Sequence, residues 1–389
     1  MNISIVTKEW PPDIYGGAGV HVEHLVAQLR KSETVDVHCF GSDKAGAMAY
    51  QTPPNLASSN SAIQTLGINL EMVKDFSKAE VIHSHTWYAN MAGHVGSLMY
   101  GVPHVLTAHS LEPRRPWKAE QLGGGYEVSS WIERTAYDAA DAIVAVSNGM
   151  RRDILECYPD VDPARVHVVY NGIDTQAISR VDDSSALVKY GIEPARPYVL
   201  FVGRITRQKG IMHLLRAVEL LPPDIGVVLC ASSPDTPELG QEVAEQVSKL
   251  SASRTGIHWI KEQLPRPELI QVLSHATVFA CPSIYEPLGI VNLEAMACEV
   301  PVVASDVGGI PEVVVDGTTG LTIHYDQSAT DEFELRFAEA LTLVTSDADL
   351  ATRMGKAGRT RAVNDFGWDR IALETIAIYQ KVAAVGPPS

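Results

Sequence analysis

The chain has 389 residues, of which 46% are hydrophobic, and a formal net charge of −16. Its length predicts about two domains, and the acidic balance argues against nonspecific binding to nucleic acid or to an anionic membrane, since both require a basic surface. No apolar run approaches the roughly 20 residues that span a bilayer, and we recognise no secretory leader. The five cysteines are odd in number and form no Cys-x-x-Cys pair, so we expect reduced thiols in a cytoplasmic protein.

Apolar, β-branched runs alternate with stretches of helical period in the first half of the chain. After the first run, Ile3–Val6, the apolar residues Val22, Leu25, Val26 and Leu29 repeat at helical spacing. This alternation predicts a parallel sheet covered by helices on both faces. The other strands expected in this half are Val35–Phe40, Val81–Ile82, Val105–Thr107, Ala142–Val146 and Val166–Tyr170. The segment 41–61, rich in Ser, Pro, Ala and Asn, is expected to be a loop.

The same alternation restarts after the turn at Asn171-Gly172, which predicts a second Rossmann-like α/β domain. Its expected strands are Tyr198–Val202, Val227–Cys230, Ile257–Ile260, Val278–Ala280 and Val302–Ala304. We therefore expect one domain over residues 1–170, a second over 171–367 and a C-terminal helix over 368–389.

Two cations follow the first strand of the second half. Arg204 and Lys209 lie in a loop that opens and closes on glycine and precedes a helix. An exposed pair of this kind would ordinarily be a surface feature. Two cations beside a helix amino terminus also suit the phosphates of a ligand, and we favour that interpretation.

Two carboxylates, Glu286 and Glu294, follow the predicted strand Val278–Ala280 and flank the start of a helix. The carboxyl end of a strand is where α/β sheets bind ligands. Carboxylates that bind sugar hydroxyls, beside cations that bind a diphosphate, indicate a site for a nucleotide-activated sugar. A glycoside hydrolase could also use two carboxylates, but it would leave Arg204 and Lys209 without a task.

Three histidines follow strands in the first half. His109 comes after Val105–Thr107, and we expect it to act in the site. His83 and His85 form a His-x-His pair that lacks a third ligand at sensible spacing, so we interpret them as structural or site-lining. The Asp-x-Asp pairs at 160–162 and 347–349 precede helical runs, so we expect helix caps there and no metal site.

Together these motifs resemble the retaining glycosyltransferases of family 4 over nearly the whole chain. The motifs that carry the resemblance are Gly16–Gly19, Thr107–His109, Tyr170–Asp174, the loop from Gly203 to Gly210, Glu286–Glu294 and Val307–Glu312. The resemblance implies the GT-B fold, in which two Rossmann-like domains face each other across a cleft and a C-terminal helix crosses back onto the first. It also implies transfer with retention and without a metal ion.

For the donor, the resemblance implies that Arg204 and Lys209 bind the diphosphate and stabilise it as it leaves. It implies that Glu286 supports positive charge at the anomeric carbon, that His109 positions the sugar and that Glu294 binds the ribose. The other expected donor contacts are Gly16, Gly17, Ile260, Leu264, Gly289, Ile290, Val291, Asn292 and Leu293. No cofactor is expected besides the nucleotide-sugar co-substrate, for which we expect ADP-glucose.

For the acceptor, residues 1–30 and the loop 110–118 resemble actinobacterial enzymes of the glycogen pathway, some of which make α-maltose 1-phosphate. The cations Arg114, Arg115 and Lys118 are a poor match for neutral glycogen, although a solvated basic loop would look the same. Trp117 offers a flat face to a sugar ring. We therefore expect glucose 1-phosphate as the acceptor.

Other functions remain open on the sequence alone. One is extension of an α-1,4-glucan from ADP-glucose or UDP-glucose. A second is transfer of another sugar to a small phosphorylated acceptor such as inositol phosphate, and a third is a nucleotide-sugar sensor without catalysis. The sequence also leaves homo-oligomerisation open.

Overall fold

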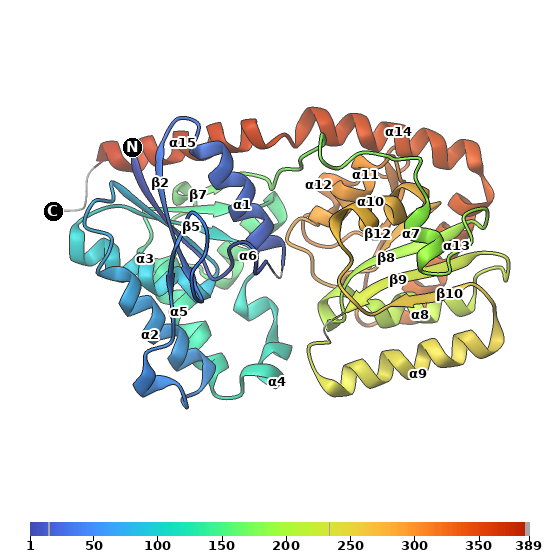
Figure 1. Ribbon diagram of the computed structural model, residues 1–389, viewed down its shortest axis with the longest axis horizontal. Coiled ribbons are helices and arrows are strands. Elements are labelled where there is room, and N and C mark those ends of the chain that lie inside the picture. The colour runs from blue at the N-terminus through green and yellow to red at the C-terminus, as the bar shows by residue number, and fades with distance from the viewer. Residues whose placement is uncertain (15, 233, 386–389) are drawn as a thin grey trace. The chain divides into compact units, whose positions relative to one another are not determined.

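The protein is described by a computed structural model over residues 1–14, 16–232 and 234–385. The chain divides into two compact units (Figure 1). Unit 1 joins Met1–Gly172 to the C-terminal segment that begins at Trp368, and unit 2 is Ile173–Gly367. Among the described helices none is long and apolar enough to cross a membrane.

Unit 1 is built on a parallel sheet of seven strands in the order β3-β2-β1-β4-β5-β6-β7. The strands are β1 (Asn2–Val6), β2 (Thr34–Phe40), β3 (Met48–Tyr50), β4 (Val81–His85), β5 (His104–Ala108), β6 (Ala142–Ala145) and β7 (Val166–Val168). The order reverses between β1 and β4, so the loops after these two strands diverge at a switch point, the position where α/β proteins of this kind bind ligands.

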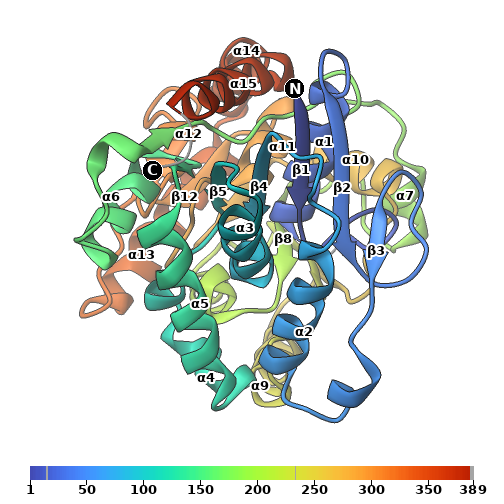
Figure 2. The same cartoon turned by 90° about the vertical axis from the view of Figure 1, so that its left-hand side faces the viewer.

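Helices cover both faces of this sheet. They are α1 (Gly17–Leu29), α2 (Ser61–Val73), α3 (Trp87–Tyr100), α4 (Ala119–Leu122), α5 (Gly125–Ala139), α6 (Asn148–Cys157) and α15 (Trp368–Val385). Figure 2 shows α2, α3 and α5 side by side over one face. On the other, α15 packs beside α1 and buries Trp368, Ile371 and Tyr379 in the same core as Ile3 and Ile5.

Unit 2 has a parallel sheet of six strands in the order β10-β9-β8-β11-β12-β13. The strands are β8 (Tyr198–Arg204), β9 (Gly226–Ser232), β10 (Ile257–Ile260), β11 (Val278–Cys281), β12 (Val302–Ser305) and β13 (Gly320–Ile323). This is the strand order of the dinucleotide-binding Rossmann fold, and its switch point lies between β8 and β11. The helices are α7 (Ser185–Lys189), α8 (Ile211–Glu219), α9 (Pro237–Ser253), α10 (Arg266–His275), α11 (Ile290–Ala297), α12 (Ile310–Val313), α13 (Thr330–Ser346) and α14 (Ala348–Asp365).

Two elements differ from the expectations. The strand β3 lies inside the segment 41–61 that was expected to be a loop, and it pairs with β2 through His38 and Met48. The strand β13, which was not predicted, extends the sheet of unit 2 beyond β12. The interpretation of the Asp-x-Asp pairs as helix caps is confirmed, since Asp347 accepts from the amide of Leu350 at 2.8 Å and Asp162 from that of Ala164 at 2.9 Å.

Candidate active site

In unit 2 the predicted cations and carboxylates gather at the switch point of the sheet. Arg204 is the last residue of β8, and Glu286 lies in the loop that follows β11, the strand paired with β8. Lys209 ends the short 3₁₀ helix Arg207–Lys209, where the side chain of Thr206 accepts from its amide at 3.2 Å. The strand order thus brings together residues that are about eighty positions apart in the chain.

Lys209 and Glu286 form a partly buried ion pair, in which the side chain of Lys209 is 25% exposed and that of Glu286 7% exposed. The Nζ of Lys209 lies 2.7 Å from Oε2 of Glu286, and the hydroxyl of Ser283 donates to the same oxygen at 3.1 Å. Burial alone would lower the pKa of Lys209, but the charge of Glu286 and the hydrogen bond to it prevail and raise it. Arg204 pairs with Asp235 at 3.2 Å, a partner that no motif in the sequence indicated. Both cations are therefore held in place by carboxylates.

Two glycines allow the loop of Glu286 to pack tightly. Gly210 has φ +63°, and a Cβ there would lie 1.9 Å from the carbonyl oxygen of Pro282. Gly308 has φ +57°, and its Cβ would lie 2.0 Å from the carbonyl oxygen of Glu286, which also accepts from the amide of Gly309 at 2.9 Å. The glycines of the Val307–Glu312 motif therefore support the backbone of Glu286, a role that the sequence did not predict.

The helix α11 begins directly after Gly289, so the amides of Ile290 and Val291 lie in its first turn. Glu294 lies one turn further on, with its side chain 17% exposed and one oxygen 4.0 Å from Arg266. Burial raises the pKa of Glu294, and Arg266 opposes that shift. The other predicted donor residues of this unit are buried or partly buried and comprise Ile260, Leu264, Asn292 and Leu293.

In unit 1 the glycine loop meets a carboxylate of the chain itself. The amide of Gly16, the residue before α1, donates to Oε2 of Glu9 at 2.9 Å. A Cβ on Gly19 would lie 2.5 Å from the same oxygen, so this close approach depends on glycine. Glu9 follows β1 and had no sequence signal. It stabilises the amino terminus of α1, next to the predicted donor contacts Gly16 and Gly17.

Four histidines cluster beside the carboxyl ends of β4 and β5. Nδ1 of His85 lies 3.0 Å from Nε2 of His109, and His21 of α1 contacts both rings. No third ligand stands near the His83/His85 pair in the sequence, but the fold brings His21 to His85 and His109 from a distant element. His83 is structural, with its ring nitrogens bonded to Tyr379 and Thr107. Burial lowers the pKa of His21 to about 4 and those of His85 and His109 well below 6.5, so these rings are neutral.

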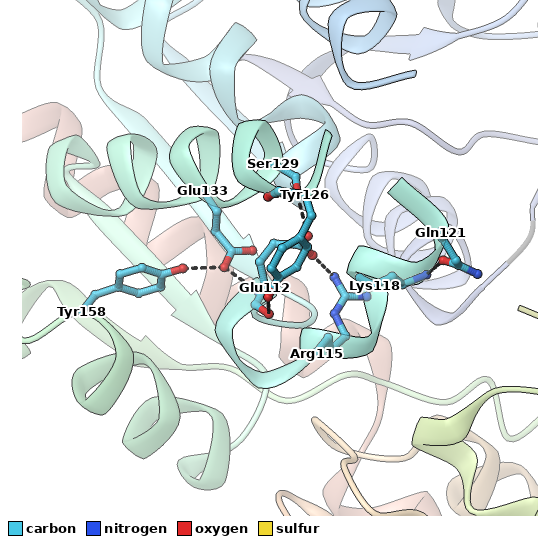
Figure 3. A network of polar contacts seen from close by, with 8 residues as sticks. All are labelled: Glu112, Arg115, Lys118, Gln121, Tyr126, Ser129, Glu133 and Tyr158. Carbon is cyan, nitrogen blue, oxygen red and sulfur yellow. Dashed lines mark hydrogen bonds and ion pairs between the residues drawn. The ribbon is translucent and has the colours of Figure 1, made fainter. Parts of the chain in front are cut away.

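The predicted acceptor loop is largely paired with acidic side chains. Arg114 lies 2.9 Å from Asp153 and also pairs with Glu156, both on α6. Arg115 pairs with Glu112. In the same loop the ammonium group of Lys118 donates to the side-chain oxygen Oε1 of Gln121 (Figure 3), and Trp117 is half-buried. The cations are therefore less available to a phosphate than their spacing suggested.

Two buried carboxyl groups anchor this loop to α5 (Figure 3). Glu133 accepts from the amide of Glu112 at 2.7 Å and from the hydroxyl of Tyr158 at 2.5 Å. The carboxylate of Glu112 accepts from Ser129 at 2.7 Å, and its carbonyl oxygen accepts from Tyr126 at 2.7 Å. Burial and the charge of Glu112 raise the pKa of Glu133 to about 8, so it holds a proton at neutral pH.

The proton on Glu133 makes the stability of unit 1 depend on pH. The folded chain retains this proton up to about pH 8, whereas the unfolded chain releases it near 4.5, so the free energy of unfolding falls as pH rises between these values. Glu133→Gln keeps both acceptor contacts but has no proton to lose. We expect its free energy of unfolding, measured relative to that of the wild type, to rise by roughly 2–4 kcal/mol when the pH is raised from 5.5 to 8.5. Urea unfolding at both pH values measures this. Glu127→Gln, on the exposed side of α5, should show the same pH dependence of unfolding as the wild type. If Glu133→Gln also showed the wild-type pH dependence, the proton could not be on Glu133.

Comparison with known proteins identifies the family. The family model described as Glycosyltransferase Family 4 matches residues 15–177, and that described as Glycosyl transferases group 1 matches residues 183–361. The chain is 56% identical, over 99% of its length and 100% of the relative, to the Alpha-maltose-1-phosphate synthase of Mycolicibacterium smegmatis, and 53% identical, with the same coverage, to that of Mycobacterium tuberculosis.

A solved structure supports the fold. Sucrose-phosphate synthase from Thermosynechococcus elongatus superposes with a TM-score of 0.81 at 22% identity and covers 99% of this chain and 100% of its own. At that identity the match bears on architecture alone. Since both family models and two full-length relatives agree with this architecture, the chain belongs to the glycosyltransferases of family 4 and has the GT-B fold of two Rossmann-like units.

Proposed function

We propose that this protein transfers glucose from ADP-glucose to glucose 1-phosphate, with retention of configuration, and so forms α-maltose 1-phosphate. The observation that carries the proposal is the similarity over the whole chain to two proteins named Alpha-maltose-1-phosphate synthase. The arrangement of Arg204, Lys209 and Glu286 at the switch point of unit 2 supports it, since it offers two cations for a diphosphate and a carboxylate for a sugar.

In the proposed reaction the bond between the anomeric carbon and the diphosphate breaks as a hydroxyl of glucose 1-phosphate attacks from the same face. The hydroxyl proton passes to the departing phosphate oxygen, and ADP leaves. Arg204 and Lys209 stabilise the negative charge that grows on that phosphate. Because the protein supplies both cations, we propose that no metal ion and no cofactor are needed.

Glu286 and His109 act on the sugar in this scheme. The buried carboxylate of Glu286 supports the positive charge that develops at the anomeric carbon. A neutral His109 can exchange hydrogen bonds with sugar hydroxyls without placing a competing positive charge nearby. The amides at the start of α11 and the carboxylate of Glu294 bind the rest of the donor, and Gly16 and Gly17 remain predicted donor contacts.

The acceptor phosphate is assigned to Arg114, Arg115 and Lys118, with Trp117 against the sugar ring. Since Arg114 and Arg115 already have carboxylate partners, a phosphate would have to share or displace Glu156 and Glu112. This neutralised loop favours a second candidate, the extension of a neutral α-glucan.

The cysteines of the described chain are free thiols, which fits the cytoplasmic location that we infer.

A direct assay separates the two candidates. The purified protein is incubated with ADP-glucose or UDP-glucose and with either glucose 1-phosphate or glycogen, and both the released nucleotide and the product are identified by NMR. We expect ADP-glucose with glucose 1-phosphate to be the faster pair and its product to be α-maltose 1-phosphate. Faster transfer to glycogen would establish the second candidate, and nucleotide release that no acceptor stimulates would contradict both.

A further inference from the structure

Three imidazoles from separate elements of unit 1 converge on one point. They belong to His21 in α1, His85 at the end of β4 and His109 directly after β5. One ring nitrogen of each lies within 4.8 Å of one on each of the others. The ring centroids are 4.8 Å apart for His21 and His109, 5.3 Å for His85 and His109, and 5.5 Å for His21 and His85.

One hydrogen bond of the cluster fixes a nitrogen lone pair that has no proton donor, and a second ring nitrogen is buried without a partner. Nδ1 of His21 lies 2.7 Å from the amide oxygen of Asn171, which can only accept, so Nδ1 carries the proton and Nε2 carries the lone pair. That Nε2 is buried and has no hydrogen-bond partner within the described part of the chain, and the same holds for Nε2 of His85. An unpaired buried nitrogen of this kind destabilises the fold unless something binds it.

Other buried histidines of the described chain do not combine an unpaired ring nitrogen with two neighbouring imidazoles in a metal-binding arrangement. His83, on the same strand as His85, has both ring nitrogens satisfied. His38 and His104 each leave one ring nitrogen unpaired, but among the residues that the structure describes only the three clustered histidines form a group that could hold a metal ion. The unpaired nitrogens of the cluster therefore differ from those of an isolated core histidine.

Neutral imidazoles at close range are ligands for borderline divalent metals such as Zn²⁺. Nitrogens bound at about 2.0–2.1 Å in a tetrahedron lie about 3.3 Å apart. Nδ1 of His85 and Nε2 of His109, now 3.0 Å apart, would therefore give up their hydrogen bond and separate slightly, and any pair as far apart as 4.8 Å would have to approach by about 1.5 Å. The side-chain oxygen of Asn171 accepts from Nδ1 of His21, the kind of hydrogen bond that commonly orients a histidine whose other nitrogen binds a metal. Three histidines would leave a fourth position for water or a sugar oxygen.

We propose that His21, His85 and His109 form a binding site for a divalent transition-metal ion, represented by Zn²⁺, and that its occupation blocks glycosyl transfer. A metal at this point takes the imidazole of His109 away from the sugar. The binding claim is independent of the proposed function, whereas the blocking claim rests on it. The site is inhibitory and serves no step of the reaction, so it agrees with metal-free transfer.

Binding is tested on the full chain after EDTA treatment and desalting. Calorimetric titration with Zn²⁺ is expected to give one ion per chain, and Co²⁺ is expected to give the intense visible absorption of a tetrahedral complex. His85→Gln should abolish both signals, and Asn171→Ala should weaken Zn²⁺ binding by about 10–100-fold. The control is His324→Gln, which removes an exposed histidine 2.8 Å from Asp306, a pair that could bind Zn²⁺ adventitiously, and it should leave binding unchanged.

A second variant, His109→Gln, distinguishes the loss of Zn²⁺ binding from a folding defect in His85→Gln, which replaces a fully buried ring. His109→Gln changes a less buried ring and should also lose Zn²⁺ while keeping the melting temperature of the metal-free wild type. Zn²⁺ should raise the melting temperatures of the wild type and of His324→Gln but not those of His85→Gln and His109→Gln, because it stabilises only a folded chain that retains the site. The site would be overturned if the wild type, His85→Gln and His109→Gln bound Zn²⁺ equally, or if His324→Gln lost Zn²⁺ binding.

The blocking claim is tested by ADP release from ADP-glucose and glucose 1-phosphate. We expect activity to fall over the same Zn²⁺ concentrations that saturate the calorimetric site and to return when EDTA is added. Full activity with the site saturated would overturn the block but not the binding. A metal-free protein that releases no ADP would instead contradict the proposed function, so the two failures are distinguishable.

Discussion

Lys209→Ala is expected to lower kcat by about 10²–10³-fold, the usual cost of removing one contact to charge that develops in a transition state. Its ammonium group lies 2.7 Å from Glu286, so the substitution also leaves a buried carboxylate without its partner. Steady-state kinetics with ADP-glucose measures the first effect, and the melting temperature measures the second. The matched control is Lys189→Ala, which removes a more exposed lysine with a similar partner, Glu268, and should keep native turnover.

Arg204→Ala tests the second cation of the same site. We expect a loss of similar size with a smaller change in stability, because the side chain of Arg204 is more exposed than that of Lys209, at 35% against 25%. Near-native turnover in both variants would exclude the assignment of the diphosphate to these residues. A loss that appears only in KM would show that the cations bind the donor but do not stabilise its departure.

Glu286→Gln is expected to reduce kcat by about 10²-fold with little change in donor affinity. The amide keeps the shape of the side chain and can still accept from Lys209 and Ser283, but it loses the negative charge that supports the anomeric centre. Single-turnover kinetics gives the rate, and calorimetry with ADP gives the affinity. Glu294→Gln is the comparison variant, and its effect should appear mainly in donor binding. If Glu286→Gln changed affinity alone, Glu286 would be a binding residue and the charge argument would fail.

Most of both sheets could be predicted from the sequence, because their central strands are buried on two faces and read as continuous apolar runs. The strands that escaped prediction lie at the edges. β3 is three residues long and follows a loop rich in turn-forming residues, and β13 begins at Gly320, where a Cβ would lie 2.0 Å from the carbonyl oxygen of Val302. Edge strands gain their identity from a neighbour, and that information is not local.

The candidate site divides in the same way. Lys209 and Glu286 could be matched in advance, since residues that follow neighbouring parallel strands meet at one edge of the sheet. The carboxylates that accompany the cations could not, because Asp153 comes from α6 and Asp235 from the loop between β9 and α9, and the directions of both side chains depend on packing. His21 was missed for a related reason. It lies on α1 beside the apolar stripe, and only the packing of α1 brings it to β4 and β5.

The return of α15 to the first unit sets an order of events during synthesis. The core that contains Ile3 and Ile5 is completed by Trp368 and Tyr379, and Tyr379 also bonds to His83 in the middle of the sheet. A ribosome that adds about 5–20 residues per second needs roughly 10–40 s to make the intervening unit. Throughout that interval the nascent first unit exposes the apolar face that α15 will cover, so it depends on chaperones or on a slow rate of aggregation until the last helix emerges.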